Sequence, residues 1–203
     1  MEIANLRART RHRAVALPAK SVVYIVDRPD SQQSVIIAGH AIPPKSFARD
    51  IAFEAANEVF GGDFSSRINM NLREDKHWSY GAYAFPTDAR GPRPYRVSAP
   101  VQTDKTAESM AEIAKEYAGF VGAKPATADE LKAAKDRSTL TLPGRWETIN
   151  AVLGDVVYQK RFGLAEDHWS TYAAKVNALT LDEVNAVARE VIEAVLADER
   201  GES

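Results

Sequence analysis

Cysteine is absent from this chain of 203 residues. Its absence excludes disulfide bonds, thiolate metal ligands and a cysteine nucleophile. Long apolar runs are also missing, and no segment reaches the ~20 apolar residues that a membrane-spanning helix needs. The first twenty residues contain several arginines but no apolar core of a secretory signal, so we expect an arm or linker at residues 1–20.

Catalytic motifs are equally scarce. The four histidines, His12, His40, His77 and His168, do not pair at a metal-ligand spacing, and neither H-E-x-x-H nor H-x-x-E-H occurs. The nucleophile elbow G-x-S-x-G and the phosphate loop G-x-x-x-x-G-K-[ST] are missing too. The net charge of −2 gives no general attraction for nucleic acid. We therefore expect no metal ligands, no resident cofactor and no nucleic-acid partner for this chain.

What is present is an ordinary globular composition. Hydrophobic residues make up 45% of the chain and charged residues 27%. Such values are typical of a chain that buries a substantial core. No repeat, linker or low-complexity stretch divides the sequence, so we expect one domain over residues 1–203.

Periodicity and turn residues predict strands first and helices afterwards. Short β-branched or alternating runs predict strands at residues 21–26, 34–40, 79–85 and 95–101. Helical periodicity and capping signals predict helices at residues 47–60, 63–75, 106–121, 127–142, 146–161, 168–179 and 180–196. Thr127 with Glu130, and Thr180 with Glu183, have the spacing of capping boxes. The order predicts an α+β fold with one mixed, largely antiparallel sheet, helices on one face, and the first two strands paired as a hairpin.

Two hydrogen-bond donors fall close together in the middle of the chain. Arg73 lies at the end of a predicted helix, and Tyr80 lies at the start of the next predicted strand. A guanidinium and a phenol at one loop suit a carbonyl oxygen that gains negative charge in acyl transfer. The alternative is structural, with Arg73 favourable at a helix C-terminus and Tyr80 half-buried in a strand. Spacing alone favours this structural alternative.

The same segment carries a family resemblance. The run G-G-x-F-S-S-R-(x)5-R-E-(x)5-Y, from Gly61 to Tyr80, resembles the signature of the C-terminal, non-zinc domain of pitrilysin/insulinase peptidases. The likeness extends over roughly residues 21–192. One departure is the loop from Asp75 to Ser79, where we expect His77 at the surface and Trp78 packed.

The resemblance implies a division of labour between two halves of a zinc peptidase. The partner domain or subunit would carry H-x-x-E-H and the zinc ion, and the two halves would close on a peptide like a clam shell. In this chain Arg73 would bind a substrate carbonyl and Tyr80 would stabilise the oxyanion, with Ser79 beside them in the substrate site.

The chain would then be part of a metalloendopeptidase without being active alone. A non-catalytic structural or peptide-binding member of the family is the alternative. The compartment stays open, with the periplasm favoured by analogy and the cytoplasm as the alternative.

Overall fold

The computed structural model describes residues 22–192. Three antiparallel strands, β1 (Gln33–Ile42), β2 (Tyr83–Pro86) and β3 (Arg93–Gln102), form a sheet in the order β1-β3-β2. Ile36 lies opposite Ala99 in the register of β1 with β3. The long strand β3 is therefore central and joins two strands that lie far apart in the sequence.

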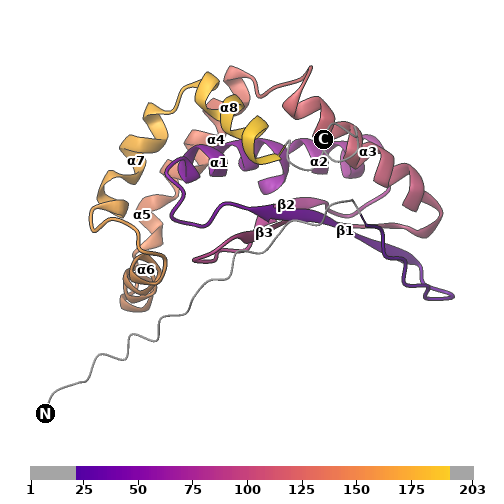
Figure 1. The fold of residues 1–203 in the computed structure, drawn as a ribbon, viewed down its shortest axis with the longest axis horizontal. Coiled ribbons are helices and arrows are strands. Elements are labelled where there is room, and N and C mark those ends of the chain that lie inside the picture. Colours follow the sequence, from indigo (N-terminus) through magenta and orange to yellow (C-terminus); the bar gives the residue numbers. More distant parts are fainter. Residues whose placement is uncertain (1–21, 193–203) are drawn as a thin grey trace, which may run out of the picture.

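Helical segments supply the other layer. Most of them gather on one face of the sheet, while α5, α6 and α7 lie beyond one end of it (Figure 1). The segments are α1 (Asp50–Asn57), η1 (Glu58–Gly62), α2 (Arg67–Asn69), η2 (Met70–Asp75), η3 (Thr103–Lys105), α3 (Thr106–Val121), α4 (Ala128–Leu140), α5 (Leu142–Arg145), α6 (Ile149–Phe162), α7 (His168–Ala178) and α8 (Leu181–Ile192). The predicted α+β fold with helices on one face is thus confirmed.

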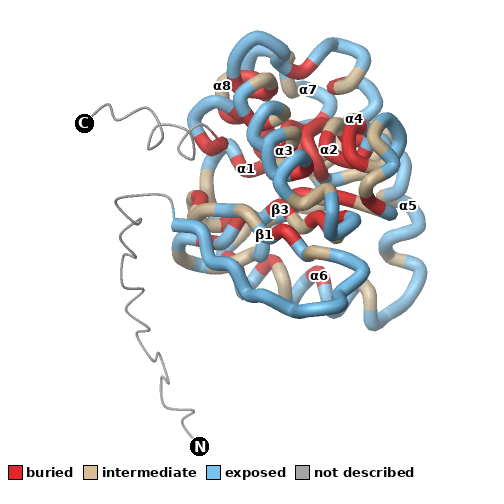
Figure 2. The backbone as a smooth tube through the Cα atoms, turned by 90° about the vertical axis from the view of Figure 1, so that its right-hand side faces the viewer, coloured by how far each residue is buried: buried red, intermediate tan, exposed pale blue. Residues whose placement is uncertain are grey.

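The core lies between β3 and the covering helices. Alternate residues of β3 are fully buried, namely Tyr95, Val97, Ala99 and Val101, because successive side chains of a strand point to opposite faces. Figure 2 shows the buried backbone concentrated between this strand and α1, α2 and α3. Burial of this apolar surface is the main force that holds the two layers together.

The predicted hairpin between residues 21–26 and β1 is wrong. Residue 21 lies outside the described part, and Val22–Val26 form no strand. Their side chains face solvent, with Tyr24 86% and Ile25 88% exposed. β-branched residues favour an extended backbone, but a strand also needs a ladder partner. β1 pairs with β3 instead.

The predicted strand at residues 79–85 begins later than expected. β2 starts at Tyr83, and only an isolated bridge joins Ser79 to Val101. The Ser79 hydroxyl accepts from the Gly81 backbone N–H at 3.1 Å. This local hydrogen bond offers the backbone an alternative to the ladder, and Tyr80 consequently lies in a loop.

Helix boundaries differ from the predictions by a few residues. The helix predicted to begin at residue 63 begins at Arg67, because the Asp63 carboxylate accepts from the Ser65 N–H at 3.0 Å and Ser66 is extended. Both capping boxes are confirmed, with Thr127 N–H to Glu130 and Thr180 N–H to Glu183 at 2.8 Å each. The helix predicted to reach residue 196 is described to Ile192, and residues 193–196 lie outside the described range. Among the helices of residues 22–192, none is long and apolar enough to cross a bilayer.

The first prediction concerns Gly61, which lies in the last turn of the helix of α1 and η1, against β2. A Cβ atom at this position would lie 2.7 Å from the backbone nitrogen of Ala84, which cannot move away cheaply. We expect Gly61→Ala to lower the free energy of unfolding by about 1–3 kcal/mol, as overpacking does. Urea unfolding followed by circular dichroism measures the change.

Gly154→Ala is the matched control, because Gly154 lies in α6 and no atom lies within 4 Å of an added Cβ. This substitution should raise the unfolding free energy by up to about 1 kcal/mol, through helix propensity. Equal effects of the two substitutions would mean that β2 does not approach Gly61 closely.

Candidate functional site

Arg73 lies on the last turns of the helix formed by α2 and η2. Its guanidinium carbon lies 4.4 Å from the centre of the Phe64 ring, and its Nε lies 3.4 Å from Glu74. The side chain remains 35% exposed. Stacking on an aromatic face restricts a guanidinium while leaving its N–H donors directed at solvent. Arg73 is therefore held against Phe64 while it stays partly exposed.

A tight turn fixes the chain after Arg73. The Trp78 N–H donates to the Leu72 carbonyl at 2.9 Å, and the His77 ring nitrogen Nδ1 lies 3.0 Å from the Arg73 carbonyl. His77 has a left-handed backbone with φ of 57°, which suits a helix C-terminus. As expected, His77 is exposed and Trp78 packs against the core.

Tyr80 follows this turn and projects into solvent, with 85% of its surface exposed. Ser79, beside it, is 8% exposed, and its hydroxyl donates to the Pro100 carbonyl at 2.6 Å. Arg73 and Tyr80 thus lie on either side of the turn, and within residues 22–192 no hydrogen bond or ring contact joins them. The Ser79 hydroxyl faces inward, and its contact with a substrate stays a prediction.

Arg67, the first arginine of the motif, has a structural role that sequence analysis did not assign. Its Nε and Nη2 each donate to Glu130 at 2.7 Å, and Nη2 also donates to the Pro125 carbonyl at 2.9 Å. These bonds tie the start of α2 to the capping box of α4. The sequence identified Glu130 as part of a capping box. It did not indicate that Glu130 also binds the distant Arg67.

The described residues 22–192 bring together no set of side chains that fits a zinc ion. Within residues 22–192, no group of three or more His, Cys, Asp or Glu side chains lies close enough together to hold a metal. His40 lies against the Val191 carbonyl at 2.8 Å, and burial lowers its pKa. His77 and His168 belong to other parts of the fold, and His12 lies outside the described residues.

Comparison with protein families decides the relationship. A family model described as "Peptidase M16 inactive domain" matches residues 6–138, which is well over half of the chain. The chain belongs to the peptidase M16 inactive-domain family. A search of curated proteins found no match.

Solved structures with the same fold agree with this membership. The peptidase M16 inactive domain from Pseudomonas fluorescens aligns with a TM-score of 0.71 and 19% identity, over 79% of this chain and 38% of that one. A protease from Helicobacter pylori aligns with a TM-score of 0.73 and 16% identity, over 82% of this chain and 40% of that one. A chain of Complex III2 from Candida albicans aligns with a TM-score of 0.62 and 12% identity, over 79% of this chain and 40% of that one. This chain thus spans about two fifths of the length of each of these proteins. Sequence identities this low show a shared fold alone.

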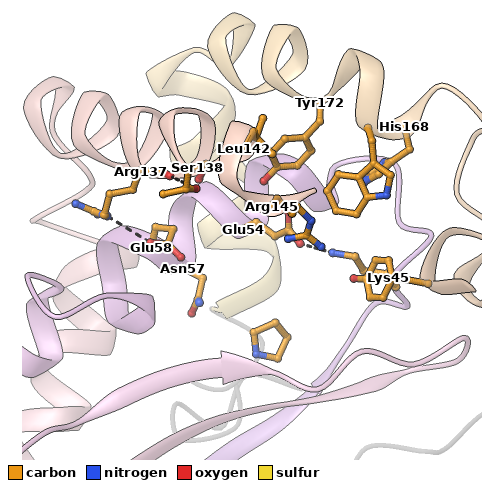
Figure 3. Close-up of a pocket in the computed structure, with 14 residues that line it drawn as sticks. Lys45, Glu54, Asn57, Glu58, Arg137, Ser138, Leu142, Arg145, His168 and Tyr172 are labelled. Atoms are coloured by element: carbon orange, nitrogen blue, oxygen red, sulfur yellow. Dashed lines mark hydrogen bonds and ion pairs between the residues drawn. The ribbon is translucent and has the colours of Figure 1, made fainter. Parts of the chain in front are cut away.

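A cavity of about 610 Å³ lies away from Arg73 and Tyr80, and sequence analysis missed it. We call it the α1 cavity; Figure 3 shows the side chains that line it. Its main walls are Glu54, Glu58, Arg137, Tyr158, Trp169 and Tyr172. These residues come from four helices, with α1 and η1 taken as one. A sequence pattern within one segment could show only that Glu54 and Glu58 lie one turn apart and that Trp169 lies close to Tyr172.

One ion pair holds the far wall of this cavity. Arg145 donates from Nε and Nη2 to both oxygens of Asp155 at 2.6 Å, and the Trp146 indole N–H donates to Asp155 at 2.7 Å. The Arg145 guanidinium in turn lies 4.2 Å from the centre of the Trp169 rings. Arg145 thereby connects α6, which carries Asp155, to α7.

The second prediction follows from the pKa of Asp155, which the hydrogen bonds from Arg145 lower. Because this pKa is lower in the folded than in the unfolded protein, the pair stabilises the fold above about pH 4 and loses this effect as the pH falls further. We expect Asp155→Asn to be less stable than the parent at pH 7 and to lose less stability between pH 4 and pH 2.

Chemical unfolding at a series of pH values measures both slopes. Asp104→Asn, at an exposed carboxylate in η3, controls for the loss of one negative charge. Identical pH slopes for the parent and Asp155→Asn would contradict the role given to the pair.

Proposed function

We propose that this chain is the substrate-binding, non-zinc half of a zinc metallopeptidase that hydrolyses peptides. The other half, with H-x-x-E-H and the zinc ion, would be a separate domain or subunit that closes on the same chamber. One observation carries the proposal: in a member of the M16 inactive-domain family, Arg73 and Tyr80 are both presented to solvent beside one fixed turn.

The chemistry of the two side chains supports these roles. The guanidinium of Arg73 has N–H groups that can donate to a peptide carbonyl. The phenol of Tyr80 can donate one hydrogen bond to the oxygen that becomes negative in the tetrahedral intermediate. Tyr80 lies in the open, so the other half of the enzyme would have to exclude water from it before its donor became effective.

Ser79 enters this proposal in a positioning role. Its hydroxyl binds the Pro100 carbonyl and its backbone N–H donates to Leu72 at 3.2 Å. Both bonds fix the backbone that leads into Tyr80. We therefore propose substrate contact for Arg73 and Tyr80, and for Ser79 a place in the substrate site where it also fixes the backbone that leads into Tyr80.

A structural or peptide-binding role without catalysis is the second candidate. The observation that favours it is the same fold in Complex III2 from Candida albicans. A scaffold has no use for an oriented arginine and an exposed tyrosine at this turn. The two candidates differ in whether the chain supports peptide cleavage when it is combined with an H-x-x-E-H half.

The third prediction tests Tyr80 in that combined enzyme. Tyr80→Phe removes the hydroxyl and keeps the ring, so binding of the peptide should change little. We expect kcat to fall by roughly 10²-fold or more, as loss of one oxyanion donor does. Hydrolysis of a quenched fluorescent peptide gives kcat and KM separately.

Tyr24→Phe is the matched control, because Tyr24 is 86% exposed and outside the proposed site; its kcat should equal that of the parent. An unchanged kcat for Tyr80→Phe would remove Tyr80 from the mechanism. No cleavage by the combined parent halves, despite stable association, would favour the scaffold role.

A further inference from the structure

Asn69 is a buried polar residue that has no part in the function proposed above. It is the last residue of α2, and its surface is fully buried. Its Nδ2 donates to the Phe64 carbonyl at 2.6 Å, and its Oδ1 accepts from the Ala82 N–H at 3.1 Å. A carbonyl only accepts and an N–H only donates, so one orientation of the amide satisfies both bonds. One side chain thus joins the segment before α2 to the segment that leads into β2.

The first of these bonds holds the residue on which Arg73 stacks. The Phe64 ring centre lies 4.4 Å from the Arg73 guanidinium carbon. The Asn69 bond fixes the backbone of Phe64, from which this ring projects. A shift of Phe64 would therefore move the Arg73 guanidinium or release it from the ring, because the contact between a cation and an aromatic face depends on their distance.

The second bond fixes the chain just after Tyr80. Ala82 lies two residues beyond Tyr80 and is fully buried. On the other side of Tyr80, the Ser79 hydroxyl donates to the Pro100 carbonyl at 2.6 Å. The exposed Tyr80 is therefore held from both sides, by Ser79 before it and by the bond from Asn69 after it.

We propose that Asn69 is a positioning residue that fixes Arg73 and Tyr80 relative to each other. The turn after Arg73 connects the two along the chain, and Asn69 adds a second connection across the fold, through Phe64 and Ala82. That a substrate uses this placement rests on the proposed function. Two connections restrict the placement more than one, and a misplacement of about 1 Å can cost about 10²-fold in rate.

Two substitutions separate the two bonds. Asn69→Asp keeps the shape and an oxygen that accepts from Ala82, but its carboxylate cannot donate to Phe64. The protonated carboxyl can donate again. Burial and the facing carbonyl both favour the protonated form and raise the pKa of the new carboxyl, so the bond to Phe64 should return as the pH falls. Asn69→Leu has a similar shape and forms neither bond.

NMR spectra of the 203-residue chain test the positioning without any cleavage. The side-chain proton signals of Arg73 sense the Phe64 ring, and the amide signal of Ala82 senses its hydrogen bond. In Asn69→Asp we expect the Arg73 signals to move away from those of the parent as the pH rises from 5 to 9, with the Ala82 signal nearly unchanged. Asn69→Leu should move both at every pH. Parent-like Arg73 signals in both variants would overturn the proposal.

Kinetics of the chain combined with an H-x-x-E-H half give the second readout. Loss of the Phe64 bond displaces a group that binds substrate, so the ionised form of Asn69→Asp should raise KM about tenfold and change kcat less than about twofold. Loss of the Ala82 bond also displaces the oxyanion donor, so Asn69→Leu should in addition lower kcat roughly 10- to 100-fold. A general loss of stability would not separate KM from kcat in this way.

Asn185 on α8 provides the matched control. It is also buried and uses both ends of its amide, with Oδ1 accepting from the Ala126 N–H at 2.8 Å and Nδ2 donating to the Ala126 carbonyl at 3.2 Å. Asn185→Asp should lose stability as Asn69→Asp does, yet keep the KM and kcat of the parent. Equal kinetic constants for these two variants would mean that Asn69 only stabilises the fold, and would overturn the proposal.

The two readouts also separate this proposal from the proposed function. If Asn69→Leu does not fold, Asn69→Ala removes the same two bonds. The expected NMR changes without cleavage by the combined parent halves would end the proposed function and leave Asn69 as the residue that positions Arg73 and Tyr80. Cleavage that depends on Tyr80 but is unaffected by every Asn69 substitution would do the reverse.

Discussion

The buried charge of Arg93 is the constraint on which most of this structure depends. The side chain is 1% exposed, and its guanidinium binds Asp50, Asp88 and the Pro43 carbonyl. Burial lowers its pKa to about 10, which still leaves it charged at neutral pH. Removing one member of such a buried pair typically costs about 3–5 kcal/mol, because the other charge is left uncompensated. The start of α1 is therefore tied firmly to the first residue of β3.

The α1 cavity and the turn after Arg73 are both positioned by the helix of α1 and η1. Asp50 is at the N-terminal end, where Lys45 joins it to Glu54 and so to the α1 cavity. Asp88 extends the same network to the Tyr158 hydroxyl on α6. At the other end, the contact of Gly61 with Ala84 sets the approach of the helix to β2. The chain then continues into the helix that carries Arg73. The position of α1 against the sheet therefore fixes both the α1 cavity and the turn after Arg73.

Local signals predicted much of this arrangement. Helix periodicity and capping boxes located the helices because their causes lie within a few residues, as with Thr127 and Glu130. The helix predicted at residues 63–75 placed Arg73 at a helix end, and the structure has it there. Tyr80 was misplaced, because the Ser79 side chain replaces a backbone ladder bond. The α1 cavity could not be predicted, since its walls come from residues as distant as Glu54 and Tyr172 and no single segment contains its pattern.

The exposed run Val22–Val26 affects how the protein must be handled. Four of its five residues are β-branched, none is charged, and its backbone is paired with no strand of residues 22–192. Uncharged, β-branched segments of this kind add readily to the free strand edges of other molecules. With a net charge of only −2, long-range repulsion between copies is weak. Colloidal behaviour of the purified chain will thus be governed by this short stretch far more than by the stability of the fold.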